Sequence, residues 1–254
     1  MSASTARSYP RHTHDQYGIG MVDCGGHASW SGRGNVEAGP GDFICVNPGE
    51  VHDGRALAQR SRAWRILYLE PTQMRDLQEH VYAVSQSSFT FESPVFCDAR
   101  LRRNFDAAFR FAKRQTNSAL EKLACETAVL TLLAGLKRHS TAVPYGCSRT
   151  TPCIRRAQAR IDDDPAASLT LEELAREAGV SRYQLLRGFS RELGLTPHAY
   201  VLQQRIALAR RLVRTGCSLT EAALASGFCD QSHLNRWFLR QFGVSPGRYA
   251  SNFA

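Results

Sequence analysis

The sequence contains no long apolar run. No stretch approaches the roughly 18 uninterrupted apolar residues that a membrane-spanning helix requires, and the first fifteen residues have no apolar core of the kind found in signal peptides. We therefore expect a cytoplasmic protein with no membrane partner. No C-x-x-C pair occurs among the eight cysteines, so we interpret them as reduced core residues or surface thiols rather than disulfides.

Lysine is absent from the last part of the chain. From Thr151 to the end there are 14 Arg and no Lys against 9 Asp plus Glu, which gives +5 of the total net charge of +9. Such a charge favours a polyanionic partner, although the skew alone is weak evidence. At 254 residues with 43% hydrophobic and 22% charged residues, the composition indicates a folded protein of one or two domains.

One segment occurs twice in the last hundred residues. Residues 168–200 align with residues 217–249 at an offset of 48, which becomes 49 at the turn because the second copy is one residue longer there. The matched positions hold the same or equivalent residue types, as in Thr170/Ser218, Glu173/Glu221, Gly179/Gly227, Ser181/Asp230, Leu185/Leu234, Phe189/Phe238, Gly194/Gly243, Pro197/Pro246 and Tyr200/Tyr249.

Each copy predicts two helices joined by a tight turn. Thr170-x-x-Glu173 and its repeat are capping boxes that begin the first helix. Gly179 suits the left-handed residue that ends this helix, and Ser181 is the N-cap of the next one. In that second helix Leu185 and Phe189 lie four apart and form a buried stripe. This spacing is typical of a helix-turn-helix, whose second helix enters the major groove of DNA.

The exposed face of each second helix carries side chains suited to reading DNA bases. Arg, Gln and Asn can make bidentate hydrogen bonds to guanine or adenine, and Tyr or Leu can pack on thymine methyl groups. The helical period points the following residues away from the core: Arg182, Tyr183, Leu186, Arg187, Gln231, Ser232, Asn235 and Arg236. Between the copies, residues 197–216 predict one long helix that would hold the two units about one DNA turn, ~34 Å, apart.

Residues 151–250 resemble the DNA-binding domain of the AraC/XylS family of regulators. The segment ASGFCDQSHLNRWFLRQFGVSPGRY matches the family signature at positions that include Gly227, Phe228, Phe238 and Pro246. The resemblance implies that the exposed residues above contact double-stranded DNA. Two departures affect the first unit, because Leu186 is apolar where a polar reader is common and Gly188 costs ~1 kcal/mol in mid-helix. We therefore expect less specificity from the first unit.

The N-terminal half predicts short strands broken by Gly, Pro and Asp turns, at YGIGMVDC, GDFICVN and AWRILYLE. His12-x-His14 and the segment from Gly41 to His52 resemble the motifs of the cupin-like sensor barrel of AraC-type proteins. Such a barrel can enclose one small molecule. We expect His12, His14, His52, Trp64 and Tyr68 to bind the effector. The sequence does not decide which face of the strand at 64–70 points into the barrel.

The three histidines leave two interpretations open. Neutral imidazoles can hold Zn²⁺ or Fe²⁺, but the Glu of the cupin metal set is not in its usual place. We expect no metal, no other cofactor and no catalytic residue, and we interpret the imidazoles as lining a ligand pocket.

The expected fold class is α+β with two domains, a cupin-like β-barrel with a helical pair and an all-α double helix-turn-helix. The domains are a sensor barrel at 1–97, a helical pair at 98–139, a linker at 140–152 and the DNA-binding domain at 153–254. The helical pair packs on the barrel and is the candidate surface for a homodimer.

The expected function is a DNA-binding transcription regulator that responds to a small-molecule effector and works as an activator, with RNA polymerase as a further partner. Two rivals remain. A cupin metalloenzyme with an appended DNA-binding domain predicts stoichiometric metal on purification. A ligand-independent DNA-binding protein predicts no ligand-dependent change in stability or DNA affinity.

Overall fold

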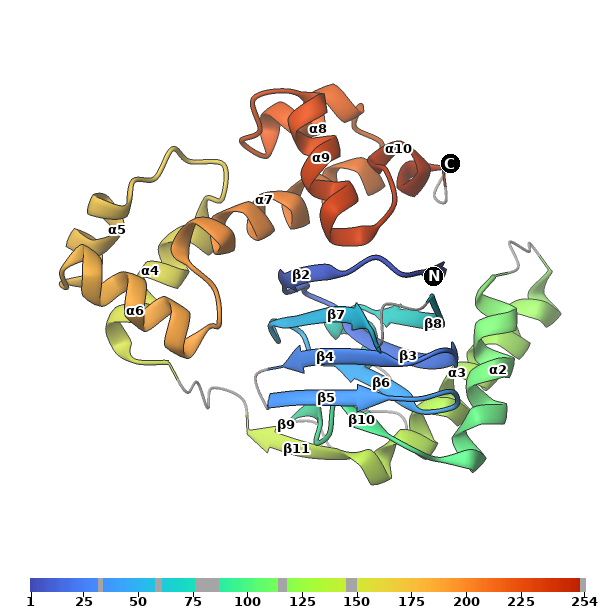
Figure 1. Ribbon diagram of the computed structural model, residues 1–254. Coiled ribbons are helices and arrows are strands. Elements are labelled where there is room, and N and C mark those ends of the chain that lie inside the picture. Colours follow the sequence, from blue (N-terminus) through green and yellow to red (C-terminus); the bar gives the residue numbers. More distant parts are fainter. Residues whose placement is uncertain (32–33, 58–60, 76–86, 114–117, 145–149, 252–254) are drawn as a thin grey trace. The chain divides into compact units, whose positions relative to one another are not determined.

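The computed structural model describes the chain except residues 32–33, 58–60, 76–86, 114–117, 145–149 and 252–254. The chain divides into two compact units (Figure 1). The N-terminal unit comprises residues 1–8 and 15–147, and the C-terminal unit comprises residues 148–254 together with residues 9–14. No helix among the described residues is long and apolar enough to cross a membrane.

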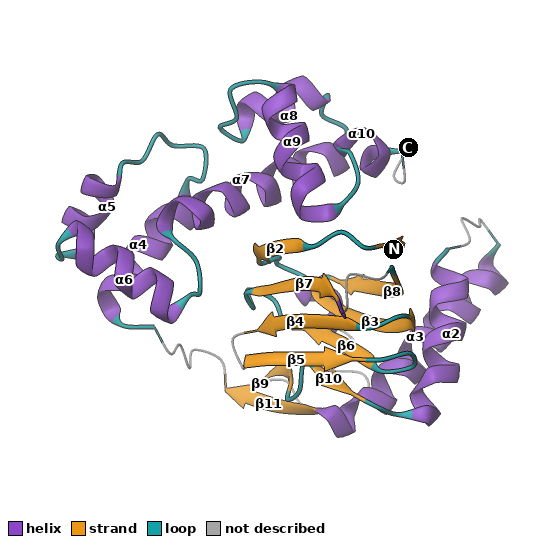
Figure 2. Ribbon diagram, viewed as in Figure 1, coloured by secondary structure: helices purple, strands orange, loops and turns teal. Residues whose placement is uncertain are grey.

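Two antiparallel sheets form the N-terminal unit (Figure 2). The first has the order β1 (Ser2–Thr5), β8 (Arg62–Leu69), β3 (Tyr17–Cys24), β6 (Phe43–Val46), β10 (Val95–Phe96). In the second, β4 (His27–Ser31) pairs with β5 (Gly34–Ala38) and with β7 (His52–Ala56). A further pair consists of β9 (Ser87–Phe91) and β11 (Ser140–Pro144). Residues 140–144, which the sequence places in the linker, therefore form a strand.

Two helices cover the outer face of the first sheet. These are α2 (Ala99–Ala112) and α3 (Ala119–Leu136), and their buried side chains join those of β3, β6 and β9 in one apolar core. In α2 the buried residues Leu101, Phe105, Ala108 and Phe109 form one stripe that faces this core. The helix begins at Asp98, whose side chain accepts hydrogen bonds from two backbone N–H groups.

The other face of the first sheet points at the second sheet. Along β8 the buried residues alternate, with Arg62, Trp64 and Ile66 on one face, whereas Leu67 and Leu69 pack against the core beneath the helices. The ring of Trp64 lies 6.3 Å from that of His27 on β4. The alternation of β8 therefore places Trp64 and Tyr68 on the face between the sheets, which settles the choice that the sequence left open.

The C-terminal unit is all helical apart from one short N-terminal strand. Its helices are α4 (Pro152–Asp163), α5 (Leu171–Ala178), α6 (Arg182–Glu192), α7 (Pro197–Arg214), α8 (Leu219–Ala225), α9 (Gln231–Phe242) and α10 (Pro246–Ala250). The long α7 runs between the group α4–α6 and the group α8–α10 (Figure 1). Both predicted helix-turn-helix units are present, as α5–α6 and α8–α9.

Residues 9–14, which include β2 (Tyr9–His12), belong to this unit. Gln203 on α7 accepts a 2.6 Å hydrogen bond from the backbone N–H of Thr13, and the side-chain amide of Gln241 on α9 donates a 3.0 Å bond to the backbone oxygen of Thr13. Both bonds are buried. The peptide groups of Thr13 are thereby satisfied by helices that follow about 190 residues or more along the chain.

Every cysteine that the structure describes is a free thiol. Cys45 is buried, and burial raises the pKa of its thiol. These cysteines agree with the sequence interpretation of core residues and surface thiols.

Candidate functional site

The caps of both helix-turn-helix units are those that the sequence predicts. Thr170 and Ser218 each form a complete capping box with the Glu three residues on. Gly179 and Gly227 turn the chain at φ values of 70° and 80°, where a side chain would be strained. Ser181 and Asp230 accept hydrogen bonds from the first turns of α6 and α9. These contacts fix where each second helix begins.

The second helices bury one face and expose the other. Leu185, Phe189, Leu234 and Phe238 are each 0% exposed, so the predicted stripe is confirmed in both copies. All residues that we expect to read DNA are exposed: Arg182, Tyr183, Leu186, Arg187, Gln231, Ser232, Asn235 and Arg236. The two helices thus expose equivalent positions of the repeat, although Leu186 in the first copy is apolar where the second copy has Asn235.

Contacts among these exposed side chains orient some of them. The guanidinium of Arg187 lies over the ring of Tyr183, 5.5 Å from its centroid, a cation–π arrangement. The hydroxyl of Thr220 donates to Oε1 of Gln231 at 3.1 Å. This bond orients the side-chain amide of Gln231 and so sets the direction of its nitrogen. Arg187 and Gln231 are therefore partly ordered before any ligand binds.

The glycine in the middle of α6 has a packing reason. A methyl group at Gly188 would lie 2.5 Å from Cδ1 of Ile154 on α4, so a larger residue would force the Ile154 side chain to shift. The departure noted in the sequence therefore serves the packing of the unit, and the residue lies on the buried face rather than on the reading face.

Arg205 connects the two helix-turn-helix units and was missed in the sequence. From α7 its guanidinium donates to the backbone oxygens of Pro165 at 2.8 Å, Ala167 at 2.9 Å and Gly227 at 2.6 Å. The first two precede α5, and the third lies in the turn of the second unit. Its position on the predicted long helix gave no signal, because the carbonyl groups it binds come from distant segments.

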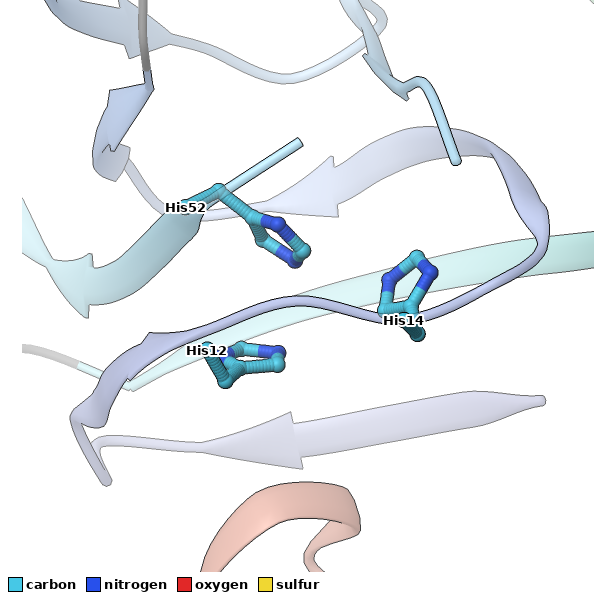
Figure 3. Close-up of side chains that lie close together, drawn as sticks. All are labelled: His12, His14 and His52. Atoms are coloured by element: carbon cyan, nitrogen blue, oxygen red, sulfur yellow. The ribbon is translucent and has the colours of Figure 1, made fainter. Parts of the chain in front are cut away.

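The candidate ligand histidines lie close together. One ligand nitrogen of His12, of His14 and of His52 can be chosen so that all lie within 4.8 Å of one another (Figure 3). Nδ1 of His12 is 2.8 Å from the oxygen of Pro10, and Nδ1 of His52 is 3.0 Å from the oxygen of Glu50. Such bonds favour the tautomer with a proton on Nδ1 and a lone pair on Nε2. The cluster could hold a metal ion.

Trp64 and Tyr68, the other expected ligand residues, differ in burial. Trp64 is 8% exposed, and Tyr68 is half-buried on the same face of β8. Sequence reasoning missed two buried neighbours of Trp64, namely Arg62 and His27. Arg62 lies two residues before Trp64 on β8, so the alternation of side chains along a strand predicts that both lie on the same face. His27 lies on β4, which the sequence analysis does not identify as a strand.

Comparisons with known proteins cover the whole chain. The AraC-like ligand binding domain family matches residues 2–133, and a helix-turn-helix domain family matches residues 174–252. A transcriptional regulator of Bacillus subtilis, YbfI, is 29% identical over 231 residues, 90% of this chain and 82% of that protein. The activator RhaS of Escherichia fergusonii is 31% identical over 122 residues, 48% of this chain and 43% of that protein.

Solved structures show the same architecture. An apo variant of ToxT from Vibrio cholerae superposes with a TM-score of 0.58 at 12% identity, covering 100% of this chain and 97% of that one. Wild-type ToxT with a bound unsaturated fatty acid gives a TM-score of 0.56 at 13% identity, covering 98% and 92%. At such low identity the likeness shows the fold.

A β-rich ligand-binding domain followed by two helix-turn-helix units defines a DNA-binding transcription regulator. More particularly, the chain belongs to the AraC family of transcription regulators, since the family's ligand-binding domain matches more than half of it.

Proposed function

We propose that this regulator activates transcription by reading a bipartite operator with α6 and α9 when a small-molecule effector occupies its N-terminal unit. The repeat carries the proposal, because two helix-turn-helix units present equivalent exposed faces. Arg182, Tyr183, Leu186 and Arg187 would read one half-element, and Gln231, Ser232, Asn235 and Arg236 the other. The relative RhaS is named as an activator, which supports activation as the output. In this proposal the protein works in the cytoplasm and contacts RNA polymerase to activate transcription.

The length of α7 is consistent with α6 and α9 entering successive major grooves of one DNA duplex. Its 18 residues span about 27 Å at 1.5 Å per residue, which is close to the ~34 Å of one DNA turn once the flanking turns are added. We therefore expect half-elements about one turn apart on one face of the duplex.

Selection of bound sequences from a randomised duplex library tests this proposal. The variant Arg187→Ala/Arg236→Ala loses one exposed arginine from each reading face, and we expect it to lose the bipartite motif. The control variant Arg103→Ala/Arg110→Ala removes the same charge from exposed positions of α2 and should keep the motif. Salt-sensitive binding without an enriched motif in the wild type would contradict base reading by these helices.

The same assay, run with the selected operator, tests the effector response. The match to a ligand-binding domain family supports it, and ToxT carries an unsaturated fatty acid in one solved structure. An effector shifts DNA affinity only as far as it binds the two arrangements of the protein unequally. If no compound that binds the chain changes operator affinity, the ligand-independent alternative holds.

We further propose that the protein acts as a homodimer through α3. Leu120 and Leu123 are 75% and 60% exposed, and exposed large apolar side chains on one helix favour a protein partner. A dimer would place four reading helices on one operator.

We propose that the protein is a regulator without catalytic function and that its effector response requires no metal. The relatives named above are transcriptional regulators. The three-histidine cluster is the observation that favours the rival, a metal-binding protein. Elemental analysis of the purified protein and of a His12→Ala/His14→Ala variant separates them. Stoichiometric Zn or Fe that the variant lacks would support the metal rival, and an unchanged effector response without metal would support the proposal.

A further inference from the structure

The same pair of positions makes contact in both helix-turn-helix units. In each, the second residue of the first helix approaches the first residue of the second helix, which is the one that we propose to read DNA. In the second unit these residues are Thr220 on α8 and Gln231 on α9, joined by the 3.1 Å hydrogen bond described above. In the first unit they are Glu172 on α5 and Arg182 on α6, with Oε2 of Glu172 4.0 Å from Nη1 of Arg182. The contact is therefore a property of the repeat, whereas its chemistry differs between the copies.

Helix caps fix the backbone at both ends of the Thr220–Gln231 bond. Thr220 lies two residues after Ser218, whose capping box with Glu221 begins α8. Gln231 directly follows Asp230, whose side chain accepts a hydrogen bond from the first turn of α9. Because the caps already hold the two backbones, forming this bond orders only two side chains, and it costs little conformational entropy.

The bond leaves Gln231 with the groups that match adenine. Thr220 and Gln231 are both exposed. The amide oxygen Oε1 can accept two hydrogen bonds, of which Thr220 supplies one, and the amide N–H groups remain as donors. In the major groove adenine presents the N6 donor and the N7 acceptor, which pair with one acceptor and one donor of a glutamine amide. Guanine presents two acceptors there, one of which would oppose Oε1.

We propose that Thr220 is a positioning residue that aligns Gln231 with an adenine of the second half-element. The inference rests on the proposed base reading by α9, and it names the base and the residue that helps to select it. At the equivalent positions of the first unit the acid Glu172 faces the arginine Arg182, and arginine suits guanine. The two half-elements therefore differ in sequence, and the protein binds its operator in one orientation.

Base preferences of the full chain, measured position by position by selection from a randomised duplex library, test this. Gln231→Ala identifies the base pair that Gln231 reads, where we expect the wild type to prefer adenine. Thr220→Val keeps the branched shape but removes the hydroxyl. We expect it to lower the preference for adenine at that base pair at least threefold and to leave the other positions unchanged. Thr220→Ser keeps the hydroxyl and should keep the preference.

A matched control separates positioning from a structural role. Thr215→Val makes the same chemical change at the end of α7, where the exposed hydroxyl donates to the backbone oxygen of Leu212, and it should keep every base preference. The Tm of each variant reports folding. The inference is overturned if Thr220→Val lowers the Tm but changes no base preference, or if it weakens the preference at all positions equally.

Failure of this inference can be told apart from failure of the proposed function. If Gln231→Ala changes one base pair of a bipartite motif and Thr220→Val changes none, base reading by α9 stands and the positioning role is wrong. If that base pair is selected for a base other than adenine, the assignment of the base is wrong. If the wild type selects no motif, the proposed function itself is wrong.

Discussion

Arg205 on α7 donates a 2.6 Å hydrogen bond from Nη1 to the backbone oxygen of Gly227, in the turn of the second helix-turn-helix. The same guanidinium binds the carbonyl groups of Pro165 and Ala167, just before the first unit. One side chain thus connects the segments that lead into both reading helices. Its geometry fixes how α9 is oriented relative to the group α4–α6.

Replacing Arg205 should therefore affect stability and operator reading together. For Arg205→Ala we expect the free energy of unfolding to fall by about 2–4 kcal/mol, because three carbonyl groups lose a charged donor. Arg205→Lys should recover less than half of this, since an ammonium lacks the guanidinium's fork. Urea unfolding measures the loss. Affinity for the bipartite operator should fall more than affinity for a single half-element, and equal losses would contradict a role in spacing.

Gly188→Ala should destabilise the protein although alanine is the better helix former. The gain of about 1 kcal/mol in helix propensity is outweighed by overpacking of Ile154, which costs about 1–3 kcal/mol. In an Ile154→Val background, which lacks the closest atom, the same substitution should be neutral or stabilising. Thermal unfolding of the double-mutant cycle measures the coupling, with Ser190→Ala on the exposed face of α6 as the control. Additive effects would rule out the Ile154 contact as the cause.

The low pKa of His27 predicts a loss of stability in acid. Its pKa in the folded protein is about 4 against 6.5 for the free group, so between these values the unfolded chain binds a proton that the folded chain does not. The free energy of unfolding should fall with pH over this window, by about 2.5 kcal/mol from this group between pH 7 and pH 4.5. Urea unfolding at both pH values, for the wild type and for His27→Gln, isolates the contribution. An equal pH dependence in both would contradict it.

The helix α3 should control oligomeric state. We expect Leu120→Glu/Leu123→Glu to weaken dimer formation at least tenfold, because charges would have to be buried at an apolar contact. Size-exclusion chromatography with light scattering measures the mass of the wild type and the variant. Lys122→Glu, on an exposed position of the same helix, is the control and should leave the mass unchanged. A monomeric wild type would refute the proposed dimer.

The helical unit was predictable because its signals are local. The capping box at Thr170, the left-handed Gly179 and the stripe of Leu185 and Phe189 each depend on neighbours within a few residues. Repetition of the whole pattern removed most of the remaining ambiguity. The reading faces followed from the helical period alone, and all the expected residues are exposed.

The rest depends on contacts between segments far apart in sequence. Strand β11 forms because Ser140–Pro144 pairs with β9. The sequence around residue 140 contains no local signal that predicts this pairing. The proximity of Arg62 and His27 can be predicted only when it is known which faces of the two sheets meet. Alternation placed Arg62 and Trp64 on one face, but only the fold showed that this face is the inner one.

The segment Tyr9–His14 makes the C-terminal unit discontinuous in the chain. Thr13 and Gln241, which share a hydrogen bond, are 228 residues apart, and closing a flexible loop of that length costs roughly 5 kcal/mol. Prior folding of residues 15–147 shortens the effective loop and lowers that cost. Loop entropy therefore favours folding of the inserted unit first, and Gln241 can reach Thr13 only after nearly the whole chain has been synthesised. A fragment cut at the linker would keep Gln203 and Gln241 but lose the peptide that they bind.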